Sequence, residues 1–132
     1  MGLVQLVTTI GVLTTYAGQY VGQPLYCDDG RGMVYDHSRA FIALPVTEYT
    51  AGVAMCGDWV RVTSQGHSFW ALALDAGPLE LYHVIQYGNL PIIADVPEHL
   101  WPFSPAISAE GTVFNESAFN RMCRECAMGH LR

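Results

Sequence analysis

The sequence predicts a single, mainly β domain, and three observations support this. A length of 132 residues is usual for one domain. The composition combines 13 Gly and seven Pro with only 14% charged residues, which is typical of a turn-rich β protein and not of a helical bundle. Short runs of β-branched or alternating apolar residues are separated by turn signals. We therefore expect residues 1–132 to form one domain of many short strands.

The first predicted strand covers residues 8–16. Its sequence, TTIGVLTTY, is rich in β-branched residues, and alternation puts Ile10 and Val12 on one face and Leu13 on the other. Residues 17–37 then contain four glycines, one proline and three aspartates, which predicts a long loop with tight turns. Loops of this length inside a compact domain are usually functional or braced.

A β-hairpin is the clearest local feature. Residues 59–63 (WVRVT) alternate between apolar and other side chains, and residues 68–74 (SFWALAL) return as the partner strand. The SQGH segment between them is a typical hairpin turn. We expect at least one of Trp59 and Trp70 to point inward.

Further apolar runs predict three more strands and a short helix. The strands cover residues 40–46, 79–85 and 90–94, and Pro45 marks the end or an edge position of the first. Residues 96–101 are predicted to start a short helix, because Pro97 suits its first position and Asp95 can cap it.

A second helix is predicted near the C-terminus. Asn115 or Ser117 can cap it, and Gly129 can end it. Its apolar stripe is formed by four residues at helical spacing, namely Phe119, Met122, Cys123 and Cys126.

The charge of the chain excludes some partners. A formal net charge of −6 with six basic residues spread along the chain gives no footprint for nucleic acid or an anionic membrane. A neutral polysaccharide or another protein is the more natural partner. The apolar residues 1–13 are too short and too often interrupted to span a bilayer, and they lack the pattern of a signal peptide, so we interpret them as a first strand or an arm.

The four cysteines are compatible with two disulfides, for which three pairings exist. Cys27 with Cys56 is the preferred pair, because each flanks a turn-rich segment next to a predicted strand, while Cys123 and Cys126 are already neighbours. The latter two, with His130, form half of a zinc pattern, but buried thiols or a local disulfide are favoured. The five histidines form no HxH or HxxxH pair, so we expect no metal, and we expect no cofactor.

Several segments, taken in order, resemble one known family. These are CGDWVRV at 56–62, Gly66 and ALALDAGP at 71–78, with TTY at 14–16 and IALP at 42–45 upstream and IIADV at 92–96 downstream. Their order is similar to the double-psi β-barrel family of rare lipoprotein A, expansins, barwin and family-45 endoglucanases. The resemblance implies a six-stranded double-psi β-barrel over roughly residues 8–101, with short helices and a C-terminal extension at 102–132 that carries the predicted helix.

The resemblance and the residues together predict a site around Asp75. This aspartate ends an apolar strand before a glycine-containing turn, and partly apolar surroundings raise a carboxyl pKa as a general acid requires. The alternative is that Asp75 only caps the turn. Asp95 and Asp36 are the assisting catalytic candidates, although helix capping is the favoured role of Asp95. The predicted substrate-binding residues are Tyr16, Tyr20, Tyr35 and His37.

The predicted function is therefore cleavage or binding of a cell-wall glycan, such as peptidoglycan, outside the cell or in its envelope. Cleavage would follow lytic-transglycosylase-like or hydrolytic chemistry with Asp75 as general acid. Family-45 endoglucanases carry an aspartate just after the first-strand tyrosine, where this chain has Ala17 and Gly18. The alternative is a non-catalytic structural or interaction protein of an oligomeric assembly such as a phage virion, which the 51% hydrophobic content favours.

Overall fold

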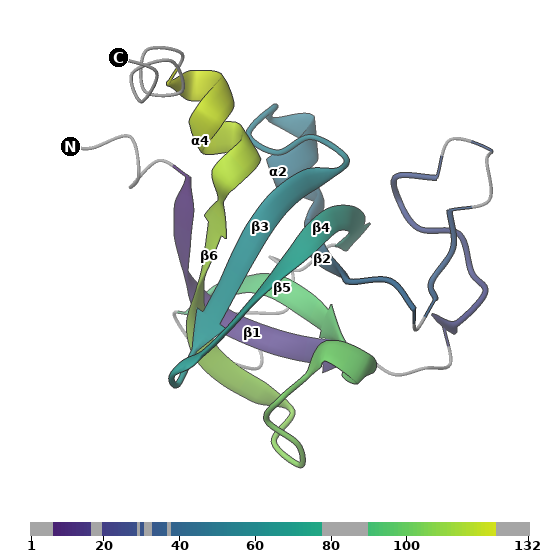
Figure 1. Ribbon diagram of the computed structural model, residues 1–132, viewed down its shortest axis with the longest axis vertical. Helices are drawn as coiled ribbons and strands as arrows, with labels where there is room; N and C mark the ends of the chain where they lie inside the picture. Colours follow the sequence, from purple (N-terminus) through teal and green to yellow (C-terminus); the bar gives the residue numbers. More distant parts are fainter. Residues whose placement is uncertain are drawn as a thin grey trace.

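Six strands form a closed barrel in the computed structural model, which describes residues 7–16, 20–28, 30, 33–36, 38–77 and 90–123. Around the barrel the strand order is β1-β5-β2-β4-β3-β6 (Figure 1). The strands are β1 (Thr8–Tyr16), β2 (Phe41–Pro45), β3 (Asp58–Ser64), β4 (His67–Gly77), β5 (Ile92–Pro97) and β6 (Ser108–Asn115). The prediction of a mainly β, six-stranded barrel is confirmed.

The barrel mixes parallel and antiparallel pairs. β1 runs parallel to β5, and β2 runs parallel to β4, while the other neighbouring strands are antiparallel. Two short helices, α2 (Val46–Thr50) and α4 (Glu116–Met122), lie at the same end of the barrel (Figure 1). The sequence analysis did not predict α2, which begins directly after Pro45. None of the helices in the described part of the chain is long and apolar enough to cross a membrane.

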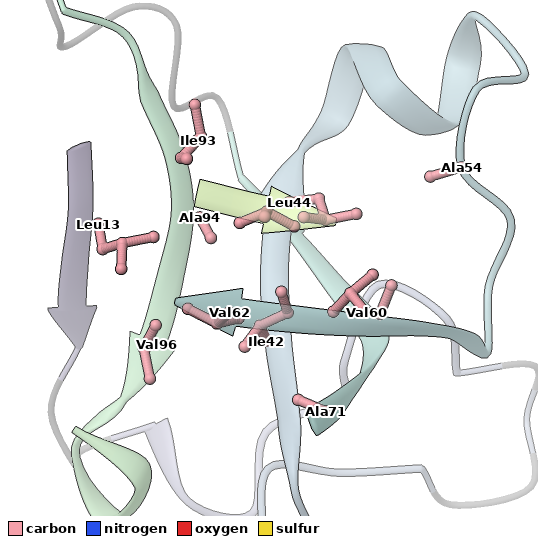
Figure 2. Close-up of a cluster of buried hydrophobic side chains, with 12 residues drawn as sticks. Leu13, Ile42, Leu44, Ala54, Val60, Val62, Ala71, Ile93, Ala94 and Val96 are labelled. Carbon is pink, nitrogen blue, oxygen red and sulfur yellow. The ribbon is translucent and has the colours of Figure 1, made fainter. Parts of the chain in front are cut away.

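The core fills the inside of the barrel with side chains from all six strands (Figure 2). In β3 these residues alternate with outward-facing ones, as in a half-buried sheet, whereas Ile93 and Ala94 of β5 are consecutive core residues. The cluster consists of Leu13, Ile42, Leu44, Ala54, Val60, Val62, Ala71, Ala73, Ile93, Ala94, Val96 and Val113. A smaller cluster of Leu25, Tyr35, Phe41 and Leu74 joins the β1–β2 loop to the barrel.

The predicted hairpin is β3 and β4. Its two-residue turn has positive φ at both Gln65 (50°) and Gly66 (81°), which is the backbone that joins twisted antiparallel strands. The expectation that Trp59 or Trp70 points inward was wrong. Both indoles lie outside the barrel, with 48% and 43% of their surface exposed, because their strand positions alternate with those of the core residues.

β1 departs from strict alternation. Its register against β5 shifts between Val12 and Leu13, and both of these consecutive side chains are buried. Such an irregularity lets neighbouring residues leave the two-residue period. Ile10, which alternation grouped with Val12, is 71% exposed.

The barrel does not end near residue 101 as the sequence predicted. β6, from the supposed extension, closes the barrel between β1 and β3. Its sequence, SAEGTVFN, gives a weak strand signal because it contains a glycine and several polar residues. Gly111 is required there, since a Cβ atom would lie 2.5 Å from the backbone oxygen of Thr63.

The short helix predicted within residues 96–101 is present in part, although it starts later than expected. β5 continues to Pro97, and only a 3-10 turn, η3 (Glu98–Leu100), follows. The C-terminal helix is confirmed as α4, where the Asn115 side chain accepts a hydrogen bond from the Ala118 amide at 2.9 Å. However, α4 ends at Met122 and not near Gly129, and Met122 is 45% exposed. The strand predicted at 79–85 lies outside the described residues.

Candidate functional site

Two aspartates flank the same residue of β2 at the end of the barrel next to the β1–β2 loop. Ala43 is in register with Asp75 of β4 on one side and with Asp95 of β5 on the other. Neighbouring strands are about 4.8 Å apart, so two strand spacings place the Cα atoms of the aspartates roughly 10 Å apart. The topology thus brings together two residues that lie 20 positions apart in sequence.

A pocket of about 290 Å³ covers this pair of aspartates. Its lining comes from β1, β2, β4, β5 and the β1–β2 loop. The lining residues are Tyr16, Tyr20, Gln23, Pro24, Leu25, Tyr35, Ala43, Asp75, Ala76, Gly77 and Asp95. We refer to this pocket as the groove. A second cavity, of about 210 Å³, has a more apolar lining in which Glu48 is the acidic residue, so it lacks a pair of carboxyl groups.

The Asp75 side chain is held from two directions. The hydroxyl of Tyr16 donates to Oδ2 at 3.1 Å, and the backbone amide of Tyr26 donates to Oδ1 at 2.9 Å. The hydroxyl of Tyr49, from α2, donates to the backbone oxygen of Asp75 at 2.7 Å. The Tyr26 and Tyr49 rings pack against each other with 5.0 Å between centroids. These contacts fix the carboxyl group at the groove.

Asp95 has a different environment. Its Oδ1 accepts a hydrogen bond from the Thr14 hydroxyl at 2.9 Å. Burial raises the pKa of Asp95 to about 6, and the negative charge of Asp75 acts in the same direction, while the Thr14 hydrogen bond opposes both. A carboxyl group that exchanges its proton near neutral pH suits general acid or base chemistry. The prediction that Asp95 caps a helix was wrong, because Asp95 lies within β5.

The tyrosines beside Asp75 stay neutral. Burial raises the pKa of Tyr16, and the charges of Asp75 and Asp95 raise it further. Burial also raises the pKa of Tyr49, again with Asp75 contributing. Both hydroxyl groups therefore keep their protons and remain hydrogen-bond donors to Asp75 across the physiological pH range.

A disulfide braces the long loop against the barrel. Cys27 and Cys56 are bonded, which confirms the predicted pair. Beside the bond, the amide of Cys27 donates to the Leu74 oxygen and the amide of Gly57 donates to the Ala73 oxygen, both at 2.9 Å. The loop is thereby fixed to β4 directly before Asp75.

The other predicted site residues have separate outcomes. Tyr16 and Tyr20 line the groove with 5.9 Å between ring centroids, and Tyr20 is 41% exposed. Tyr35 also lines it but is only 1% exposed, so it serves mainly as core, packed edge-to-face against Phe41. Asp36 is not among the lining residues, and its carboxylate accepts the Ser38 amide at 2.8 Å. His37 lies outside the described residues.

Sequence reasoning missed three residues that position the aspartates, namely Thr14, Tyr26 and Tyr49. Thr14 was part of a segment similar to the family's first strand, which was a usable signal. Tyr26 acts through its backbone amide, and Tyr49 comes from an unexpected helix, so neither had a side-chain pattern to find.

The described residues contain no group of three His, Cys, Asp or Glu side chains that could hold a metal ion. Cys123, part of the half zinc pattern, is disulfide-bonded and so is not a thiolate ligand. Cys126 and His130 lie outside the described residues.

Comparison with known proteins identifies the fold. No family model and no curated protein sequence matches the chain. Two solved structures of an expansin from Clavibacter michiganensis are similar in three dimensions: the apo protein, with a TM-score of 0.53 and 21% identity, and a point mutant in complex with cellohexaose, with a TM-score of 0.57 and 18% identity. In each case 82% of this chain matches 50% of the other, so the chain spans about half the length of those proteins. Together with the closed barrel, this likeness shows an expansin-like double-psi barrel fold.

Proposed function

We propose that the chain is a polysaccharide-binding barrel whose groove holds a segment of a cell-wall glycan over Asp75 and Asp95. The observation that carries the proposal is the position of these two carboxyl groups, on either side of Ala43 at the floor of a tyrosine-walled groove. The expansin complex with cellohexaose supports it, because a protein of which about half resembles this barrel is there in complex with an oligosaccharide.

The groove has the chemistry that sugar binding requires. Aromatic side chains bind the C–H faces of pyranose rings through apolar contact, and Tyr20 at the groove and Tyr26 beside it are 41% and 47% exposed. Carboxyl groups accept hydrogen bonds from sugar hydroxyls, and both oxygens of Asp75 are already oriented by Tyr16 and Tyr26. The groove therefore combines an apolar wall with fixed polar partners, as ligand sites do.

The same pair of aspartates supports cleavage as the finer proposal. Breaking a glycosidic bond requires an acid that protonates the leaving oxygen, while water or a sugar hydroxyl attacks the anomeric carbon. A pKa of about 6 makes Asp95 suitable as this proton donor, and Asp75 then supplies a fixed hydrogen-bond acceptor. That Asp75 itself is the acid stays a prediction, and the experiment below separates the two assignments.

We also propose that the protein works outside the cytoplasm. The Cys27–Cys56 disulfide braces the loop, and disulfides form and persist in oxidising compartments and are rare in the cytosol, which fits the predicted location outside the cell or in its envelope. The virion and oligomer alternatives stay predictions.

One experiment tests binding and cleavage together. Binding of cellohexaose and of peptidoglycan fragments is measured by calorimetry, and soluble products released from cellulose and peptidoglycan are identified by mass spectrometry. We expect Asp75→Asn and Asp95→Asn to weaken binding, and Asp36→Asn, outside the groove, to leave it unchanged. If Asp95→Asn abolishes product release and Asp75→Asn does not, Asp95 is the acid. If only Asp75→Asn abolishes it, Asp75 is the acid. Binding without products leaves a non-catalytic glycan binder, and absence of both overturns the proposal.

A further inference from the structure

A second surface on the outer wall of the barrel has the features of a ligand site. Trp59 and Arg61 of β3, Trp70 of β4 and Phe114 of β6 occupy outward-facing positions on three adjacent strands. We call these four residues the outer-wall patch. None of them lines the groove.

The patch exposes an unusual amount of aromatic surface. Trp59 and Trp70 are 48% and 43% exposed, and their rings meet edge-to-face with 6.4 Å between centroids. The core behind them is complete without them, because Val60, Val62 and Ala71 fill the inward positions of the same strands. Exposed, adjacent indoles on a sheet face are typical of interaction sites.

Arg61 lies between two rings of the patch. It is in register with Trp70 on one side and Phe114 on the other, and its Cζ atom is 5.7 Å from each ring centroid. Stacking of this kind orients a guanidinium group while leaving its N–H groups available at the edge. The side chain is thus held in place before any ligand binds.

No carboxylate within the described residues pairs with Arg61. Arg121 is the contrast, because both of its terminal nitrogens bind Asp58. On the outward positions of β3, β4 and β6 the acidic residue is Glu110, four residues from Phe114 along β6, or roughly 13 Å at the usual rise of a strand. The patch therefore offers a fixed cation that suits an external carboxylate.

We propose that the outer-wall patch binds uronic-acid residues of an acidic polysaccharide. An exposed indole face accepts the C–H face of the sugar ring, and the guanidinium group of Arg61 binds the sugar carboxylate through paired hydrogen bonds. A peptide strand is less suited to this surface, because β3 is already hydrogen-bonded to β4 and β6 and offers no free backbone edge. This inference does not depend on the groove.

The net charge of −6 does not prevent such binding. At an ionic strength of about 0.15 M the screening length is roughly 8 Å, so distant carboxylates of the protein repel the ligand weakly while a direct contact with Arg61 persists. We therefore expect binding at physiological salt.

The test uses the full chain, with oligogalacturonic acid as the probe and its methyl ester as the matched neutral control. Binding is followed by NMR of the indole N–H groups, and Trp101 is an internal control because its Nε1 donates to the Ala106 oxygen at 2.7 Å, away from the patch. We expect the Trp59 and Trp70 signals to move and the Trp101 signal to stay. The ester should bind about tenfold more weakly than the acid, since a charge-assisted pair is lost.

Variants assign the effect to Arg61. Arg61→Gln should weaken acid binding about tenfold and abolish the difference between acid and ester, while Arg61→Lys should recover part of it and Arg39→Gln should behave as wild type. Equal binding of acid and ester by the wild-type chain would overturn the proposal without need of any variant. Unchanged affinity in a folded Arg61→Gln chain would overturn it as well, as would equally tight binding of polyglutamate, which would indicate an acidic peptide as the partner.

Discussion

Asp58 at the start of β3 is buried and Asp95 in β5 is half-buried, and their hydrogen-bond partners differ. The Asp58 carboxylate accepts bonds from Arg121 at 2.6 and 2.8 Å, from the Asn115 amide at 3.0 Å and from the backbone amide of Met55 at 2.9 Å. Burial acts to raise the pKa of Asp58, but these donors outweigh burial and lower it. Asp95 accepts a hydrogen bond from the Thr14 hydroxyl, no cation among the described residues pairs with it, and burial raises its pKa to about 6.

The difference shows that burial does not by itself decide what a carboxyl group does. The number and charge of the donors decide whether the charged form is stabilised. Asp58 is ionised at neutral pH and joins β3 to α4 through Arg121. Within the described part of the chain Asp95 has one neutral donor, Thr14, and a negative neighbour, Asp75, which is unfavourable for stability but suits proton transfer. Such a trade between stability and function is common at active sites.

The Cys27–Cys56 disulfide lies between Asp58 and the groove that holds Asp75 and Asp95, so its removal tests the comparison. Cys27 follows Tyr26, whose amide binds Asp75, and Cys56 follows Met55, whose amide binds Asp58. We expect the Cys27→Ser, Cys56→Ser double variant to lose about 3–4 kcal/mol of unfolding free energy, the value for a closed loop of this length. Urea denaturation measures the loss.

Hydrogen exchange in the same double variant shows whether the groove is affected more than the rest of the barrel. The Tyr26 amide should exchange much faster, and cellohexaose binding should weaken, because the loop is no longer fixed beside Asp75. The Ala118 amide, bonded to the Asn115 side chain at 2.9 Å, should keep its protection relative to the global stability. Equal acceleration at both amides would show that the disulfide stabilises the whole barrel and does not specifically position the groove.

A second prediction concerns the ion pair of Asp58. Arg121→Met should destabilise the fold by about 2–3 kcal/mol near neutral pH, because it leaves a carboxylate with 5% side-chain exposure without its cation. The partial exposure of Arg121, 36%, keeps the effect at the lower end of the range for buried pairs. Chemical denaturation measures it, with Arg39→Met as the matched control.

The pH dependence of this effect has a definite sign. Because the pKa of Asp58 is lower in the folded than in the unfolded state, its contribution is present above the unfolded pKa of about 3.9 and is lost as the pH falls through the folded pKa. The difference between wild type and Arg121→Met should therefore shrink below about pH 4. A difference that stayed constant with pH would show that Arg121 acts through packing and not through charge.

Much of the fold could be predicted from local sequence signals. The β3–β4 hairpin has alternating residues and a turn that requires positive φ, and β2 is apolar on both faces, so each carries its own signal. β6 does not, because its strand identity depends on pairing with β1 and β3. The outward positions of Trp59 and Trp70 could not be predicted either, since only the finished barrel shows that its core is filled without them.

The sequence could predict which aspartates are candidates for the site, but it could not predict their pKa values. Asp75 was found from its place at the end of a strand before a turn. Asp95 appeared to cap a helix, because Pro97, two residues later, is compatible both with a helix start and with the end of a strand. Burial and the charge of Asp75 raise its pKa while the Thr14 hydroxyl lowers it, and these contacts come from other strands of the barrel. Sequence spacing contains no information on such contacts.

Asp95 gives the smallest of the predicted effects on stability. Its folded pKa of about 6 exceeds the ordinary value of 3.8, so the folded state binds the proton more tightly than the unfolded state does. This group therefore makes the protein more stable as the pH falls from about 7 to about 4 and less stable as it rises. Asp95→Asn should remove the pH-dependent term and stabilise the fold by about 2 kcal/mol at pH values above about 7. Denaturation series across this pH range measure both effects.

Thr14→Val is the control, because it keeps the Asp95 carboxyl group and should raise its pKa instead of removing the titration. Without the Thr14 hydroxyl, Asp95 loses the hydrogen bond that favours its charged form, so its pKa should rise above that of the wild type, as carboxyl carbon NMR would show. The pH range over which Asp95 destabilises the fold should move upward with it. If Asp95→Asn left the pH dependence of stability unchanged, or if Thr14→Val lowered the Asp95 pKa, the contrast with Asp58 would have to be attributed to something other than the hydrogen-bond donors.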